Sequence, residues 1–165
     1  MTITRKARSP KLAALLLVAL ALGACAKSPA AQDTGALANA SAASPGSQQD
    51  FVVNVGDRVF FETDSTELTP QSIATLDKQA QWLRSYPQYN FMIEGHADER
   101  GTREYNIALG ARRAQTVHDY LVSRGVQAHR MRTISYGKER PVAVCDDISC
   151  WSQNRRAVTN LNAGS

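Results

Sequence analysis

The sequence lacks the charge excess that is typical of proteins that bind nucleic acids. Its formal net charge is +4, but four basic residues, Arg5, Lys6, Arg8 and Lys11, lie at the very start of the chain. Without these four, 15 of the 19 basic residues remain, against 15 acidic ones. The rest of the chain is therefore near neutral, and its composition does not favour a nucleic-acid partner.

Familiar catalytic and metal-binding patterns are also missing. There is no HExxH motif and no G-x-S-x-G elbow. His96 and Asp98, with His118 and His129 elsewhere, offer possible metal ligands, but exposed positions on a helix explain the last two better. We therefore expect a binding protein rather than an enzyme, with no metal and no cofactor.

Cysteine is scarce as well, with only Cys25, Cys145 and Cys150. Three cysteines cannot build a four-cysteine zinc site. Cys145 and Cys150 are five positions apart, so one loop could join them as a disulfide; two reduced thiols are the alternative. An exported chain would place this pair in an oxidising compartment, which favours the disulfide.

The first 24 residues have the pattern of an export signal. Basic residues precede an apolar run at 12–22 that is too short to span a bilayer comfortably. Residues 22–25, Leu-Gly-Ala-Cys, resemble a bacterial lipobox, so we expect Cys25 to be lipidated and to become the new N-terminus. A simple cleavage site with a chance cysteine is the alternative. Ala26 and Lys27, rather than an aspartate, follow Cys25, which favours the outer membrane.

Residues 25–49 carry the lipidated cysteine and then a flexible tether. The segment is rich in Ala, Ser, Gly, Pro and Gln and has almost no aliphatic side chains, so it cannot bury enough surface to fold. Its root-mean-square reach is about 25–30 Å. The folded domain is expected at 50–165.

The remaining chain predicts an α/β two-layer sandwich. One or two strands are expected over the β-rich segments 51–55 and 57–61, and further strands around 91–93, at 131–135 and at 157–161. Thr69 and Pro70 form an N-cap and first turn of a helix that runs to about Ser85. A second helix begins near Thr102 and ends at Gly125. The order β-α-β-α-β plus a final strand predicts helices packed on one face of a mixed sheet.

The second helix carries three unusual residues on one face, Asn106, Gly110 and Arg113, at spacing i, i+4, i+7. Glycine inside a helix costs about 1 kcal/mol relative to alanine. Gly110 therefore indicates that a loop or a ligand approaches the helix backbone closely. Arg113 lies about 15 Å along the helix axis from its start. The loop at 98–102 must fold back for Asp98 to reach it.

Several separated motifs resemble the OmpA-like peptidoglycan-binding domain. They are 61–68 (FETDSTEL), 95–106 (GHADERGTREYN), 109–114 (LGARRA), 135–141 (SYGKERP) and 154–157 (NRRA). The resemblance covers roughly 52–161 and implies non-covalent binding of the diaminopimelate in the peptidoglycan stem peptide. It also implies a lipid-anchored protein of the outer membrane, facing the periplasm, with a partner in the Tol system. A protein that uses the same surface mainly for a protein partner is the alternative.

By position, the resemblance assigns the ammonium group of the ligand to Asp98 and its carboxylate to Arg113. A zwitterionic end needs one fixed anion and one fixed cation, and a guanidinium binds a carboxylate through two parallel hydrogen bonds. A salt bridge between Asp98 and Arg113 that merely pins the loop is the alternative. Further candidates for the same groove are Phe61, which could equally be core, and Thr63, Asp64, Asn106 and Arg156.

For three other residues of the 95–106 motif, the sequence predicts a less specific role. His96 could order the loop or touch the ligand, and ordering the loop is the favoured interpretation. Glu99 and Arg100 are expected to be solvated or to face a partner, as isolated loop charges usually are.

Overall fold

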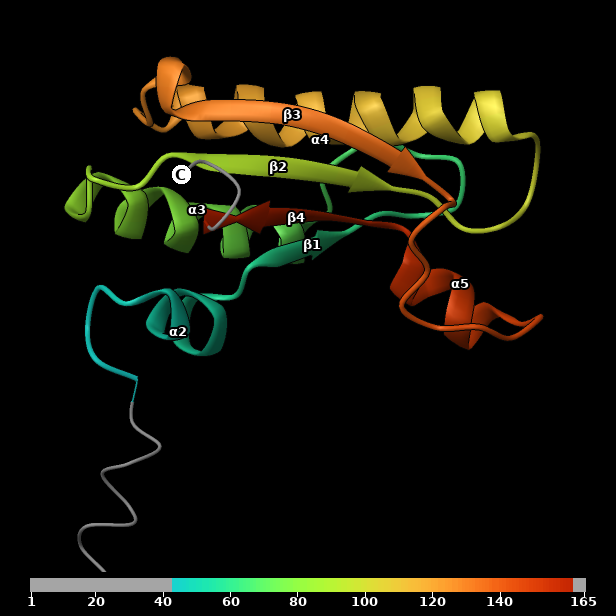
Figure 1. Ribbon diagram of the computed structural model, residues 1–165, viewed down its shortest axis with the longest axis horizontal. Coiled ribbons are helices and arrows are strands. Elements are labelled where there is room, and N and C mark those ends of the chain that lie inside the picture. The colour runs from blue at the N-terminus through green and yellow to red at the C-terminus, as the bar shows by residue number, and fades with distance from the viewer. Residues whose placement is uncertain (1–42, 162–165) are drawn as a thin grey trace, which may run out of the picture. The chain divides into compact units, whose positions relative to one another are not determined.

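A computed structural model describes residues 43–161 as a small sheet with helices (Figure 1). The strands are β1 (Arg58–Phe60), β2 (Phe91–His96), β3 (Met131–Gly137) and β4 (Arg156–Asn160). The α-helices are α2 (Gln48–Asp50), α3 (Pro70–Ser85), α4 (Arg103–Ser123) and α5 (Ile148–Asn154). A π-helical segment, η1 (Phe51–Val55), and a 3₁₀ turn, η2 (Ala128–Arg130), complete the elements. None of the helices in this range is long and apolar enough to cross a membrane.

The sheet has the strand order β1-β4-β2-β3. β2 and β3 are parallel, whereas β4 is antiparallel to both of its neighbours. The predicted α/β sandwich on a mixed sheet is confirmed. The last strand in sequence lies between β1 and β2, so the chain around Arg155 is brought next to the ends of strands that lie far from it in sequence.

The two long helices begin and end where the sequence predicts. Thr69 caps α3 by accepting a hydrogen bond from the Ser72 amide at 3.1 Å. Thr102 caps α4 in the same way, with the Tyr105 amide at 3.2 Å. Gly125 follows the end of α4 with φ +85°, a left-handed conformation that glycine adopts without strain.

α3 and α4 cover one face of the sheet and enclose the core. Alternate strand residues such as Val59, Ile93 and Ala157 are buried against apolar residues of these helices, including Leu76 and Val117. The neighbouring strand residues project from the other face, following the two-residue period of a strand. Figure 1 shows α4 lying along β2 and β3.

Of the two β-rich segments at 51–61, only the second forms a strand. Residues 51–55 form the π-helical segment η1, in which the Phe51 side chain turns inward and its ring centroid lies 4.9 Å from that of Trp82. The insert before β4 was expected to be irregular but contains α5, capped by Asp147.

The ordered chain also starts before position 50. Ser47 caps α2, and the Tyr89 hydroxyl donates to the Gly46 carbonyl at 2.8 Å. The last residues of the expected tether therefore belong to the domain. The predicted signal peptide, Cys25 and most of the tether lie outside the described residues.

Candidate functional site

The loop after β2 folds back over the first turn of α4, as the site requires. Gly101 has φ +86°, which lets the chain reverse. The Asn106 side chain then donates to the Arg100 carbonyl at 2.8 Å. The ammonium of Lys138 donates to the carbonyls of Glu99 and Gly101, at 3.1 and 2.8 Å. The loop backbone is thus fixed from α4 on one side and from the end of β3 on the other.

This fold brings Asp98 and Arg113 to the same cavity. Its volume is about 310 Å³. Of the residues proposed for the site, it is lined by Thr63, Asp64, Asp98, Asn106 and Arg113; the other lining residues are Arg100, Gly101, Tyr105 and Leu109. One carboxylate-rich side and one buried guanidinium therefore face a space large enough for an amino-acid end group.

Arg113 is fully buried and organises the floor of this cavity. Its guanidinium donates to three backbone carbonyls, those of Ser65 (2.9 Å), His96 (2.8 Å) and Glu62 (3.1 Å). These bonds tie α4 to the end of β2 and to the loop after β1. Burial, with a further contribution from the nearby charge of Arg155, lowers the pKa of Arg113 to about 10, so the group is still a cation at neutral pH.

Asp98 is paired with two other arginines. Arg100 approaches it to 2.6 Å and Arg155 to 3.3 Å. Burial alone would raise the pKa of Asp98, but the hydrogen bonds from Arg100, and then that from Arg155, outweigh it and hold the pKa below its usual range. The ion pairs of the described chain do not include a bond between Asp98 and Arg113, so the alternative of a simple salt bridge between them is wrong.

Two of the less specific candidates lie away from the cavity. The Phe61 ring is buried in the core, with the Arg113 guanidinium 5.1 Å from its centroid, which matches the core interpretation of that residue. Arg156 is held by the carbonyls of Asn154 and Arg140. Because β4 alternates, Arg156 projects from the sheet face that α3 and α4 do not cover.

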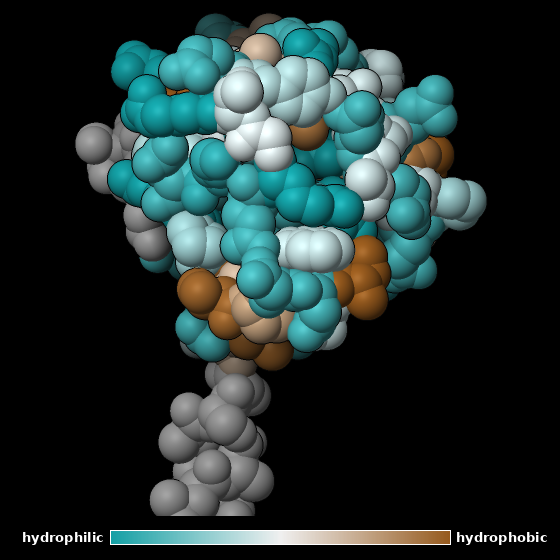
Figure 2. Space-filling view, turned by 90° about the vertical axis from the view of Figure 1, so that its right-hand side faces the viewer, coloured by the Kyte–Doolittle hydropathy of each residue, from teal (hydrophilic) through white to brown (hydrophobic). Residues whose placement is uncertain are grey.

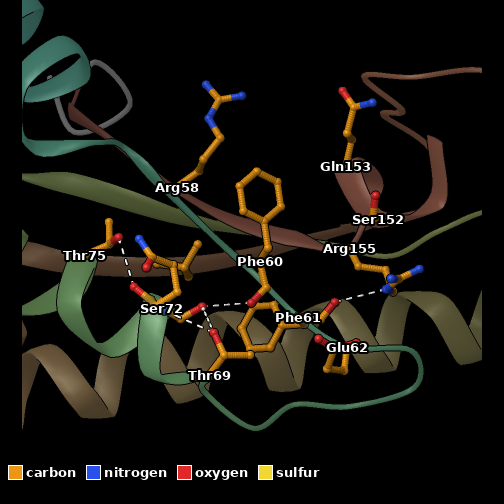
Figure 3. Close-up of a pocket in the computed structure, with 12 residues that line it drawn as sticks. Arg58, Phe60, Phe61, Glu62, Thr69, Ser72, Thr75, Ser152, Gln153 and Arg155 are labelled. Atoms are coloured by element: carbon orange, nitrogen blue, oxygen red, sulfur yellow. Dashed lines mark hydrogen bonds between the residues drawn. The ribbon is translucent and has the colours of Figure 1, made fainter. Parts of the chain in front are cut away.

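Sequence reasoning missed the role of Arg155. Its Nε donates to the Phe61 carbonyl at 3.0 Å, and its Nη1 donates to Asp98. Figure 3 shows Arg155 reaching the Phe61 carbonyl at one end of a second cavity, of about 420 Å³, between β1, α3 and α5. The sequence signal was the adjacent pair of arginines where β4 begins, Arg155 and Arg156, whose side chains point to opposite sides of the sheet.

Glu99 and Arg100 are exposed, as expected, but both also make contacts with α5. The Arg100 guanidinium lies 4.3 Å from the centre of the Trp151 ring. The indole of Trp151 donates to the Glu99 carboxylate at 2.7 Å. Trp151 is carried by α5, and no local pattern in the sequence links it to a loop 50 positions earlier.

The Cys145–Cys150 pair lies at the start of α5 and is joined as a disulfide, with the two Cα atoms 5.6 Å apart. Around it, apolar side chains are exposed: Val142 (54%), Val144 (84%) and Ile148 (61%). Figure 2 views this end of the molecule, whose surface is mostly hydrophilic with apolar residues gathered in its lower part.

The His96 side chain is buried beside Tyr136. It lies 5.6 Å from the Tyr136 ring, and in the described structure neither of its ring nitrogens has a hydrogen-bond partner. Burial and then the charges of Arg156, Arg140 and Arg58 lower its pKa to about 3. Across residues 43–161, no group of three or more His, Cys, Asp or Glu is placed to hold a metal.

Comparison with known proteins is consistent with this geometry. The model of the OmpA family matches residues 60–155. The peptidoglycan-associated lipoprotein of Rhizobium meliloti is 65% identical over 96% of this chain and 92% of its own length. The chain belongs to the peptidoglycan-associated lipoproteins of the OmpA family. The lipoprotein of the same name from Pseudomonas aeruginosa is 52% identical over 59% of this chain and 57% of its own length.

Solved structures support the same family assignment. The crystal structure of the peptidoglycan-associated lipoprotein from Burkholderia pseudomallei superposes with a TM-score of 0.61 at 45% identity, over 63% of this chain and 88% of that one. The C-terminal domain of Helicobacter pylori MotB, with a TM-score of 0.59, is only 23% identical and shares the fold alone.

Proposed function

We propose that this lipoprotein binds peptidoglycan non-covalently through the diaminopimelate of the stem peptide. Asp98 takes the ammonium group at the free end of that residue, and Arg113 takes the adjacent carboxylate. The observation that carries the proposal is that these two opposite, buried charges line one cavity although fifteen positions separate them. Burial strengthens the attraction between each charge and an oppositely charged ligand group, and a zwitterion supplies one group for each.

The protonation states suit this ligand. Asp98 stays ionised at neutral pH because its pKa is lowered, and Arg113 stays protonated. Three N–H groups of Arg113 are used by backbone carbonyls, which leaves one on each terminal nitrogen for the carboxylate. The carbonyl contacts fix the plane of the guanidinium before the ligand arrives, and such preorganisation lowers the cost of binding.

The N-terminal part of the chain supplies the anchor in this proposal. Residues 1–24 are a signal peptide, lipidated Cys25 holds the outer membrane, and the tether spans towards the cell wall. Mass spectrometry of the mature N-terminus tests this directly. A diacylated or triacylated terminal cysteine supports the anchor, whereas an unmodified terminus at another residue contradicts it.

A second role, in protein binding, is favoured by the exposed apolar side chains of Val142, Val144 and Ile148. A surface of this kind close to the wall-binding cavity suits a periplasmic partner. We propose that this partner belongs to the Tol system, which acts in envelope integrity and cell division. A protein that used this surface alone would bind such a partner and would stay in the supernatant when purified peptidoglycan is sedimented.

Sedimentation with purified peptidoglycan separates these possibilities. The wild-type domain should pellet with the wall, while Asp98→Asn and Arg113→Lys should stay largely in the supernatant. Arg112→Lys is the matched control, because Arg112 is the exposed neighbour of Arg113. Equal sedimentation of all four proteins would exclude the site. Release of soluble muropeptides by the wild type would show an enzyme instead.

A further inference from the structure

The carboxylate of Asp98 is already fully used in the structure. Oδ1 accepts from the Arg100 amide (3.2 Å) and from Arg100 Nε (3.1 Å). Oδ2 accepts from Arg100 Nη2 (2.6 Å) and from Arg155 Nη1 (3.3 Å). A carboxylate offers about four acceptor positions. A ligand ammonium can therefore bind Asp98 only if one of these donors leaves.

Arg100 is the donor that can leave. Its side chain is 41% exposed, whereas that of Arg155 is 5% exposed and is also held by the Phe61 carbonyl. The backbone around Arg100 is fixed independently of its side chain, because Lys138 and Asn106 bind the carbonyls of residues 99, 100 and 101. The guanidinium can thus swing away without a movement of the loop.

Trp151 stabilises the position in which the Arg100 side chain is bound to Asp98. Its ring lies under the Arg100 guanidinium at 4.3 Å while that group is bound to Asp98. The negative face of the indole attracts the guanidinium cation and stabilises it in this position. The indole is itself oriented by its hydrogen bond to Glu99 and carried by α5, next to the disulfide.

We propose that the Arg100 side chain is an internal occupant of the ammonium subsite, which the ligand must displace, and that Trp151 is a positioning residue that holds it there. This inference rests on the proposed function, since it takes Asp98 as the ammonium site. It makes Arg100 a competitor of the ligand rather than one of its contacts. Removing the competitor should strengthen binding, although a charge is lost from the cavity.

Calorimetric titration with two tripeptides tests the proposal. One ends in diaminopimelate and the other in lysine, which keeps the side-chain ammonium but lacks the distal carboxylate. A competitor at the ammonium subsite affects both ligands equally. Arg100→Gln should therefore tighten both by the same factor, about 1.5-fold to fivefold, as expected for loss of a partly exposed ion pair. Arg103→Gln is the matched control, because Arg103 is exposed and pairs with Glu139 outside the cavity; it should leave both affinities unchanged.

The position of Trp151 is tested in the same assay. Trp151→Ala should tighten binding by a smaller factor than Arg100→Gln and should have no effect once Arg100 is already Gln, because it acts only through that side chain. Trp151→Phe keeps an aromatic face and should remain near the wild type. Thermal unfolding of each variant verifies that it is folded.

Several outcomes would overturn the proposal. Weaker or unchanged binding of the diaminopimelate tripeptide by Arg100→Gln would do so. A loss confined to that tripeptide would show that Arg100 contacts the ligand carboxylate. If Trp151→Ala changes the affinity by the same factor with and without Arg100→Gln, Trp151 does not act through Arg100. Asp98→Asn keeps the two claims apart: if it binds like the wild type, the proposed site itself has failed.

Discussion

Gly95 of β2 and Gly110 of α4 meet backbone to backbone. A Cβ on Gly95 would lie 1.8 Å from the carbonyl oxygen of Gly110, and one on Gly110 would lie 2.4 Å from the Ser135 hydroxyl. The close approach that Gly110 indicates in the sequence is therefore made by the sheet, not by a loop or a ligand. The contact seats α4 against the sheet, so that Arg113, one turn further on, reaches the His96 carbonyl at the end of β2.

Gly110→Ala should therefore destabilise the domain. Alanine normally favours a helix by about 1 kcal/mol over glycine, but the added methyl group has no room, and overpacking costs about 1–3 kcal/mol. Urea unfolding should show this loss. Ala108→Ser, on the exposed side of the same helix, is the control and should change stability little. A Gly110→Ala variant more stable than the wild type would contradict the close packing.

Arg113 should contribute to stability as well as to binding. Arg113→Ala leaves the carbonyls of Ser65, His96 and Glu62 without their donor. At about 1 kcal/mol or more for each buried carbonyl, the loss should reach about 3 kcal/mol. Arg113→Lys keeps a charge and should lose less stability while still losing the two-point grip on a carboxylate. Equal unfolding midpoints for Arg113→Ala and the wild type would show that the carbonyl contacts contribute nothing.

The burial of His96 predicts a loss of stability in acid. Its pKa falls from the usual 6.5 to about 3 in the folded state, first through burial and then through neighbouring arginines. The unfolded chain therefore binds the proton first, and stability decreases as the pH falls from about 6.5 towards 3, by up to about 1.4 kcal/mol per pH unit. His96→Phe should flatten this part of the pH profile. An imidazole that titrates near pH 6.5 by NMR in the folded protein would contradict the prediction.

The disulfide should stabilise the segment around α5 to a modest degree. Closing a loop this short raises the free energy of the unfolded chain by about 2 kcal/mol, because it lowers the entropy of that chain. Reductant should lower the melting temperature of the wild type to that of a Cys145→Ser, Cys150→Ser double variant, which should itself be insensitive to reductant. Thiol labelling with mass detection must show that the bond was reduced. An unchanged melting temperature after complete reduction would show that the disulfide does not stabilise the domain.

The parts of the fold that could be predicted from sequence are those specified locally. Thr69 with Pro70, and Thr102 with Gly125, mark helix ends through bonds within a few residues of themselves. Residues 51–55 have a local preference for strand, but packing of Phe51 on the distant Trp82 overrides it. Seven-residue α5 offers too little periodicity to be recognised.

The candidate site also has a part that could be predicted from sequence and a part that could not. Asp98 and Arg113 could be named from motif and spacing, and their shared cavity follows from the reversal at Gly101. The contacts of Asp98 with Arg155 and of Arg100 with Trp151 bridge more than 50 positions, and β4 makes them by inserting between β1 and β2. Such contacts depend on topology, which single residues do not reveal.

A crystal structure with a bound diaminopimelate tripeptide tests the central claim most directly. The account predicts density in the 310 Å³ cavity, with the ligand ammonium at hydrogen-bond distance from Asp98 and the carboxylate beside it on Arg113. Density in the larger cavity between β1, α3 and α5, with neither residue in contact, would contradict it.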